Sequence, residues 1–205
     1  MKQIEALAAI ESLGHLLFET KDVAAVLGVE SGNANKIASR LAEGGFIVRL
    51  ARGRWALPRR LNKLAVPQHL TAPYPAYVSL QSALYQHGML SQIPVVTYAV
   101  SLARTRRYQT PLGVFSIHHV AVGFFFGFEL DGTASAFMAV PEKALLDVLY
   151  FSATRTRLLA SLPELEIPKT FSWPTAKRMA RRIPGQGRRK LVENKLAKLK
   201  ARYVH

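Results

Sequence analysis

The stretch from Ser31 to Trp55 reads SGNANKIASRLAEGGFIVRLARGRW and decides the fold of the first part of the chain. Four apolar residues in its first half follow the i, i+3, i+4, i+7 spacing of one helix face. They are Ala34, Ile37, Ala38 and Leu41. Ser31 or Asn33 is expected to cap the start of this helix, and Gly44-Gly45 to end it.

The opposite face of the predicted helix is polar and basic. Its side chains are Asn35, Lys36, Ser39 and Arg40, with Asn33 at the edge. Arg and Lys pair with guanine, Asn with adenine, and Ser with either kind of group on a base edge. The alternative interpretation is an amphipathic helix whose charged face is only solvated.

A second short helix is predicted immediately upstream, from Lys21 to Leu27, with Thr20 as its cap and Gly28 as its end. A tight turn from Gly28 to Gly32 would then join the two helices, as in a helix-turn-helix. Ala6, Leu7, Ile10 and Leu13 indicate one more helix before them.

Downstream, a basic β-hairpin is predicted. Phe46–Leu50 and Arg54–Leu57 have the composition of short strands, and Ala51, Arg52 and Gly53 would form the tip between them. Arg49, Arg52 and Arg54 lie on or near this tip. A wing beside a recognition helix places such cations against the sugar-phosphate backbone. The sequence therefore predicts a winged helix-turn-helix, whose usual partner is double-stranded DNA.

Composition describes a globular protein. Of 205 residues, 49% are hydrophobic and 20% charged, and there is no cysteine, which excludes disulfides and thiolate chemistry. The first residues contain acids, so we expect no secretory signal. The longest apolar run, Val120 to Phe128, is too short to span a bilayer. We expect a cytoplasmic protein without a membrane partner, as a monomer or a dimer.

The net charge of +15 is concentrated at the C-terminal end. From Phe151 to His205 there are 14 Lys or Arg residues against 3 acids. Such a segment attracts polyanions by counterion release, whatever their sequence. Nucleic acid is the expected partner of this region, with RNA or an acidic protein as alternatives to DNA.

Two basic helices are predicted in this region. The first runs from Lys177 to Ile183, a turn follows at Pro184 to Gly187, and the last helix runs from Arg188 to Val204. Val192, Leu196, Leu199 and Tyr203 form the apolar face of that last helix. We expect a secondary basic patch at Arg181, Arg182, Arg188, Arg189, Lys190, Lys195, Lys198 and Arg202. The alternative is a docked helix with solvated lysines.

The middle of the chain predicts a mixed unit. Ser79 would cap a helix from Leu80 to His87, and Pro141 would begin another. The predicted strands are Val95–Ser101, Gly113–Val120, Phe124–Leu130 and Thr133–Val140, the last two joined by an Asp131-Gly132 turn. The predicted fold class is α+β: a winged helix-turn-helix over residues 1–58, a linker over 59–73, and a mixed α+β domain with basic C-terminal helices over 74–205.

Several segments of the chain resemble the AbiEi family. They are LARGRW at Leu50–Trp55, AYVSLQSALYQHGML at Ala76–Leu90 and AVPEKALLDVLYF at Ala139–Phe151. The family comprises antitoxins and transcriptional regulators of type IV toxin–antitoxin, or abortive infection, systems. The resemblance implies an N-terminal winged helix that represses its own operon, and a second domain that counters a nucleotidyltransferase-like toxin. The short C-terminal region departs from the family.

No enzymatic constellation is predicted. Glu142, Lys143 and Asp147 could suggest an acidic metal site, but their spacing separates the two carboxylates around a helix. We therefore expect a charged helix start and a surface or interdomain acid. His118 and His119 are adjacent in a strand and point to opposite faces, one packed and one exposed. We expect no catalytic residue, metal or cofactor.

An aromatic cluster at Phe124, Phe125, Phe126 and Phe128 could suggest base stacking, as in single-strand binders. No Lys or Arg lies between Arg107 and Lys143, so cations are not interleaved with these rings. We predict core packing or a protein interface for the cluster.

Overall fold

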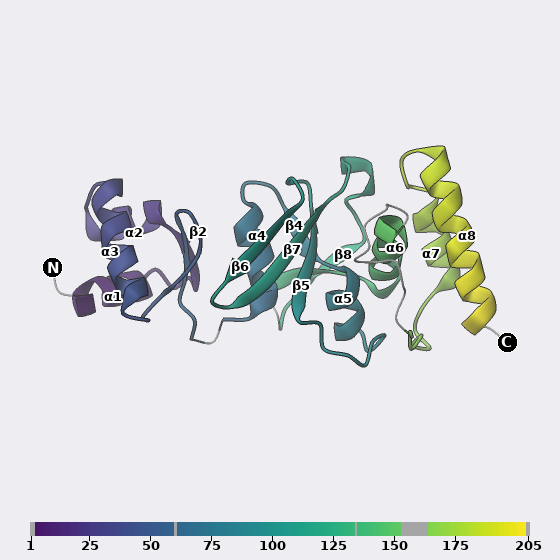
Figure 1. The fold of residues 1–205 in the computed structure, drawn as a ribbon, viewed down its shortest axis with the longest axis horizontal. Coiled ribbons are helices and arrows are strands. Elements are labelled where there is room, and N and C mark those ends of the chain that lie inside the picture. The colour runs from purple at the N-terminus through teal and green to yellow at the C-terminus, as the bar shows by residue number, and fades with distance from the viewer. Residues whose placement is uncertain (1–2, 60, 134, 153–163, 204–205) are drawn as a thin grey trace.

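The computed structural model describes residues 3–59, 61–133, 135–152 and 164–203 of the chain. Within these ranges the protein is α+β, with eight α-helices, a three-stranded antiparallel sheet and a six-stranded mixed sheet. The molecule is elongated: the N-terminal helices with the small sheet, the six-stranded sheet and the C-terminal helices follow one another, from α1 at one end to α8 at the other (Figure 1). No helix among the described residues is long and apolar enough to cross a bilayer.

Three helices and three short strands form the N-terminal unit. They are α1 (Gln3–Glu11), β1 (Leu17–Glu19), α2 (Thr20–Leu27), α3 (Ser31–Glu43), β2 (Val48–Ala51) and β3 (Arg54–Ala56). The strand order is β1-β3-β2. The helices pack on a common core with Phe18, Ile47 and Trp55, all three of them buried. The apolar stripe predicted for α3 is confirmed at Ala34, Ala38 and Leu41, which are fully buried.

The helix starts differ from the predicted caps. Glu19, not Thr20, precedes α2, and its backbone N–H donates to the Asp22 carboxylate at 2.7 Å in a capping box. Glu30 precedes α3 and makes no side-chain cap bond, so neither Ser31 nor Asn33 is the cap. The residues predicted as caps, Thr20, Ser31 and Asn33, all lie within the helices.

The six-stranded sheet forms the centre of the molecule. Its strand order is β6-β7-β5-β4-β9-β8, with β4–β9 and β5–β7 paired in parallel. The strands are β4 (Ala76–Val78), β5 (Val96–Ser101), β6 (Arg106–Thr110), β7 (Gly113–His119), β8 (Phe128–Asp131) and β9 (Ala136–Ala139). The hairpin β8–β9 was predicted, but Asp131 pairs with Ala136, so the turn is longer than the two predicted residues.

Four helices lie beside this sheet or follow it towards the C-terminal end of the molecule. They are α5 (Leu80–Gln86), α6 (Pro141–Ser152), α7 (Trp173–Ala180) and α8 (Gln186–Tyr203). Helix α6 contacts α5 on one side and both α7 and α8 on the other, and its residues from 142 to 151 are all buried (Figure 1). The predicted apolar face of the last helix is confirmed at Val192 and Leu196. Val204, its predicted end, lies outside the described residues.

The range 59–73, predicted as a linker, instead contains the 3-10 helix η1 (Lys63–Ala65) and the helix α4 (Val66–Thr71). Val66 and Leu70 of α4 are buried in a small cluster with Leu50, Ala56 and Phe115. Leu50 and Ala56 belong to the small sheet and Phe115 to the large one, and β2 also contacts β6. The segment therefore packs between the two sheets.

Candidate nucleic-acid interface

The outer face of α3 carries the polar residues that the sequence singled out. Asn33, Asn35, Lys36 and Arg40 are exposed and Ser39 is half-buried. Within the described part of the chain, the side chains of Asn35, Lys36 and Arg40 make no hydrogen bond or ion pair. All five therefore share one face of one helix, and their polar groups are available to a ligand.

Helix α3 is held by α2 across a turn of three residues. Gly28 ends α2 in the left-handed conformation (φ +62°), and its N–H donates to Ala25. Helices α1, α2 and α3 all contact one another. The buried face of α3 fixes the direction in which its polar face points.

The hairpin β2–β3 lies beside these helices. Its tip is a tight turn at Arg52 and Gly53, where Gly53 adopts φ +71°. Thr20 fixes the hairpin to α2: its backbone N–H donates to the Gly53 carbonyl at 3.0 Å, and its hydroxyl accepts from Trp55 Nε1 at 2.9 Å. Arg52 is exposed at the tip. Arg49 is also exposed, with its guanidinium 5.5 Å from the centre of the Trp55 ring.

Arg54 does not belong to this exposed set, which corrects the prediction. Its guanidinium donates to the backbone carbonyls of Leu70 and Ala72 at the end of α4. Its Nε lies 3.7 Å from the Glu19 carboxylate, and the side chain is 22% exposed. Arg54 therefore links the hairpin to α4 instead of facing solvent.

The pKa of Glu19 is lowered, mainly by its hydrogen bond from Lys21. Burial opposes this shift, and the charges of Lys21 and Arg54 add smaller lowering effects. Burial lowers the pKa of nearby His69, and the charge of Arg54 acts in the same direction. Arg54, Glu19 and His69 thus form a polar cluster inside the protein.

The second predicted patch, on α7 and α8, is divided by the structure. Four of its eight side chains contact the protein itself. The Arg182 guanidinium lies 3.5 Å from the centre of the Phe126 ring, that of Arg188 lies 4.6 Å from the centre of the Tyr150 ring, Arg189 Nε donates to the Ile183 carbonyl, and Lys195 Nζ donates to Ser152.

The other four members of that patch are Arg181, Lys190, Lys198 and Arg202. All four are exposed, as are Arg182 and Arg188. Arg202 contacts its neighbour, with its guanidinium 5.7 Å from the centre of the Tyr203 ring. The cations of α7 and α8 therefore have two roles. Some fasten these helices to the core, and the rest form a solvated positive surface.

A buried polar cluster, which we call the Lys143 cluster, was missed by the sequence reasoning. It comprises Tyr77, Ser79, Lys143 and Asp147, all at most 1% exposed. Lys143 Nζ pairs with Asp147 and donates to the Tyr77 hydroxyl at 2.8 Å. The Asp147 carboxylate accepts from Tyr77 at 3.0 Å and from Ser79 at 2.7 Å.

The expectation of a surface or interdomain acid at Asp147 was therefore wrong, because this carboxylate is fully buried. Ser79 precedes α5 as predicted, but its hydroxyl bonds to Asp147 instead of capping the helix. Glu142 is also buried and accepts the backbone N–H of Ser172 at 2.7 Å. The apolar run on every side of Lys143 and Asp147 was the signal available in the sequence.

Burial dominates the electrostatics of the Lys143 cluster. It raises the pKa of Asp147 and, together with the Asp147 charge, raises the pKa of Tyr77 well above its ordinary value. It also lowers the pKa of Lys143. Water and ligands do not reach the cluster, so its role is to hold β4, α5 and α6 together.

The aromatic cluster packs in the core, as predicted, but it does meet cations in space. Lys143 Nζ lies 3.8 Å from the centre of the Phe124 ring, and Arg182 covers Phe126. Lys143 comes from α6, and Arg182 from the turn that follows α7. Phe124 is fully buried, and Phe125, Phe126 and Phe128 are half-buried against the core.

The two adjacent histidines are arranged as predicted: His118 is half-buried against Phe151, and His119 is exposed. Among the described residues no group of three or more His, Asp or Glu is placed to hold a metal ion.

No protein-family model matches the chain, and no curated protein is significantly similar to it.

Proposed function

We propose that the protein is a sequence-specific DNA-binding transcriptional repressor with an N-terminal winged helix-turn-helix. The observation that carries this proposal is the outer face of α3, where exposed Asn35, Lys36 and Arg40 have no partner within the described residues. A helix fixed by two others, with base-reading side chains on its free face, has the form of a recognition helix for the major groove.

The hairpin β2–β3 supports the same proposal. Arg49 and Arg52 are exposed on it, next to the helical unit, where the wing of such a protein meets the sugar-phosphate backbone. In this proposal Asn33, Asn35, Lys36, Ser39 and Arg40 face the groove, while Arg49 and Arg52 hold the phosphates. Arg54 has no DNA contact.

The resemblance to the AbiEi family extends the proposal. We propose that the repressor controls the operon of a type IV toxin–antitoxin system and that its second part counters a nucleotidyltransferase-like toxin. Co-expression with the product of the adjacent gene tests this role. Restored growth of cells that produce the toxin supports it, and continued growth arrest contradicts it.

A gel-shift titration of the purified chain tests the DNA-binding proposal. The probes are the duplex upstream of its own gene and a scrambled duplex of equal length, each at two salt concentrations. Preference for the upstream duplex at the higher salt supports a repressor. Equal, strongly salt-dependent binding to both duplexes contradicts it, because counterion release then accounts for the affinity.

A charge reversal of Arg188, Arg189 and Lys190 distinguishes DNA from other partners of α7 and α8. If this surface lies along DNA, the variant binds all duplexes more weakly and with a flatter dependence on salt. An unchanged salt dependence shows that the surface faces something other than nucleic acid, such as an acidic protein. Because Arg188 and Arg189 also contact the core, a thermal melt of the variant must first show that it is folded.

A further inference from the structure

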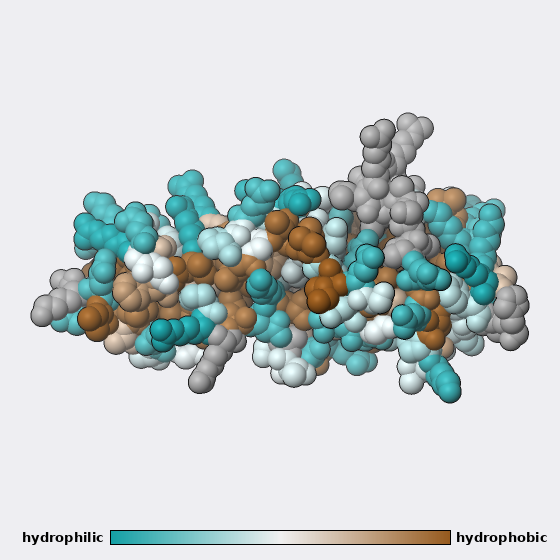
Figure 2. Space-filling model, turned by 60° about the horizontal axis from the view of Figure 1, so that its bottom comes forward, coloured by the Kyte–Doolittle hydropathy of each residue, from teal (hydrophilic) through white to brown (hydrophobic). Residues whose placement is uncertain are grey.

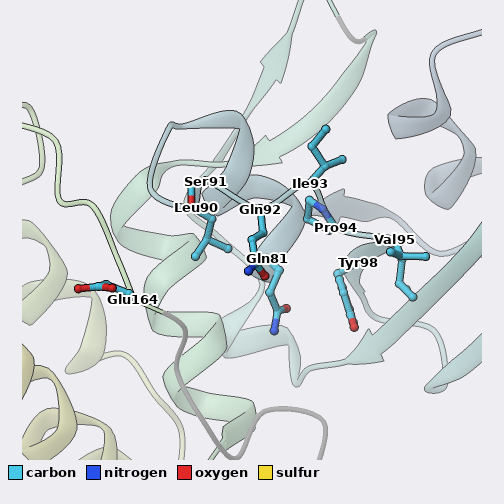
Figure 3. A pocket seen from close by; sticks show the side chains of 10 residues that line it. Gln81, Leu90, Ser91, Gln92, Ile93, Pro94, Val95, Tyr98 and Glu164 are labelled. Atoms are coloured by element: carbon cyan, nitrogen blue, oxygen red, sulfur yellow. The ribbon is translucent and has the colours of Figure 1, made fainter.

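A hollow of about 550 Å³ lies beside the loop between α5 and β5. Its walls include Gln81, Leu90, Gln92, Pro94 and Tyr98 (Figure 3). Among the described lining residues there is no cation, and Glu164 at the edge is the one charged residue. The hollow belongs to the six-stranded-sheet part of the chain, and no residue of α3 or of the β2–β3 hairpin lines it.

Two large aliphatic side chains stand in solvent at its rim. Ile93 is 74% exposed and Val95 is 92% exposed. Ile93 points away from Gln81, Leu90 and Tyr98, so it does not fill the hollow beside it (Figure 3). The space-filling view shows that apolar side chains reach the surface on the side turned forward (Figure 2). Exposed aliphatic side chains next to a hollow favour an interaction site for Ile93 and Val95.

The charge pattern indicates what kind of partner this site takes. The sequence from Leu64 to Ala103 contains no Lys, Arg, Asp or Glu, although the whole chain carries a net charge of +15. Two copies of so basic a protein repel each other through most pairs of faces. They approach without that repulsion where both contribute this neutral segment.

The shape of the site also points to a second copy. The projecting side chains belong to a loop that also lines the hollow, together with Gln81 of α5 and Tyr98 of β5. A twofold axis beside this loop would place the projection of each copy against the hollow of the other. An interface in which the same patch serves both subunits is the arrangement of symmetric dimers.

We propose that two copies of this chain pair through the loop Ser91–Val95. In the pair, Ile93 and Val95 of each copy enter the hollow beside Leu90 and Tyr98 of the other. The Gln81 side-chain oxygen is buried and has no hydrogen-bond partner in the described part of the chain. The Gln92 amide or a backbone N–H of the second copy supplies a donor to the Gln81 side chain, once the Gln81 amide turns toward it.

Sedimentation of the chain without DNA, over about 1 to 200 µM, tests the pairing, because a small interface dissociates in this range. The wild type is expected to pass from monomer to dimer, and Ile93→Glu/Val95→Glu to raise the dissociation constant at least about tenfold, since it buries like charges. Val122→Glu is the matched control: Val122 is 76% exposed outside the hollow, so its substitution leaves the mass unchanged.

Cross-linking gives a second readout that does not depend on charge. The chain has no cysteine, so Val95→Cys introduces a single thiol. A short bis-maleimide is expected to join two copies of Val95→Cys and not two copies of Val122→Cys. A wild type that stays monomeric throughout, or a dimer that persists in the double glutamate variant, overturns the proposal. Both experiments are done without DNA, so neither result tests the proposed DNA binding.

Discussion

Arg40 is an exposed side chain of α3. Its removal can distinguish recognition of DNA bases from non-specific electrostatic attraction to DNA. If it contacts a base edge, Arg40→Ala weakens binding to the operator by about 1–3 kcal/mol and relaxes the preference at one position. Quantitative gel shifts with operator and scrambled duplexes measure both effects.

Arg178→Ala provides the comparison, because Arg178 is exposed on α7, far along the molecule from α3 (Figure 1). It should change binding to both duplexes equally, or not at all. Retention of full sequence preference in Arg40→Ala would remove this residue from the set that reads bases.

His69 gives the protein a stability that depends on pH. Its pKa is lowered in the folded state because burial disfavours the charged ring. The unfolded chain therefore binds more protons than the folded chain just below the ordinary value of 6.5. This contribution to stability is present above that value and is lost as the pH falls through the folded pKa.

The substitution His69→Gln should flatten the decline of stability as the pH falls below about 6.5, measured by urea unfolding. Some decline should remain, because burial also lowers the pKa of His118. His15→Gln is the control, since His15 is exposed. An identical pH dependence in His69→Gln and the wild type would show that His69 does not contribute.

At the scale of elements, α6 is held by the Lys143 cluster as well as by apolar packing. Lys143→Met leaves Asp147 buried without a counter-charge, which should lower the free energy of unfolding by about 3–5 kcal/mol. The double substitution Lys143→Met/Asp147→Leu removes both charges and should recover a large part of that loss.

Urea unfolding of these two variants and of Lys190→Met tests this role. Lys190 is exposed on α8, so its substitution should change stability by less than about 0.5 kcal/mol. A double variant no more stable than Lys143→Met would mean that the geometry of the cluster, and not the unpaired charge, determines the cost.

At the scale of the whole molecule, two arginines of one hairpin have opposite roles. Arg54→Gln leaves two carbonyls at the end of α4 without their donor, so it should destabilise the protein by about 1–3 kcal/mol without changing the salt dependence of DNA binding. Arg52→Gln, at the exposed tip, should leave stability unchanged and reduce the salt slope by about one phosphate contact.

Thermal melts and salt titrations on both variants give the two readouts. The assignment fails if Arg54→Gln flattens the salt dependence while stability is retained. It also fails if Arg52→Gln destabilises the fold.

The features that could be predicted from the sequence are those that depend on local spacing of residues. The apolar stripe of α3 and the start of α6 at Pro141 follow from spacing and from the preference of proline for the first helical turn. Three-residue strands such as β1 and β4 were missed, because so short a segment carries no alternation. Arg54 was misassigned because its partners, Leu70 and Ala72, lie on a segment whose prolines suggested a linker.

The exposure of Asn35, Lys36 and Arg40 could be predicted for the same reason, since the polar face of α3 is the complement of its apolar stripe. The burial of Asp147 was not predicted. Charged residues at the start of a helix are usually solvated, and the partners Tyr77 and Ser79 come from a distant strand and its end. The structure alone shows that four members of the predicted basic patch contact other parts of the protein, namely Arg182, Arg188, Arg189 and Lys195.

Gly127 adopts φ +75°, and a Cβ there would lie 3.1 Å from Cβ and Cγ of Lys143. Each of five residues therefore limits which substitutions the others tolerate: Gly127 and the four members of the Lys143 cluster. A lineage that lost one of these five residues would keep the fold only by replacing its partners as well. When homologous sequences are aligned, these positions should be inherited as a block, whereas the outer face of α3 is free to diverge with each operator.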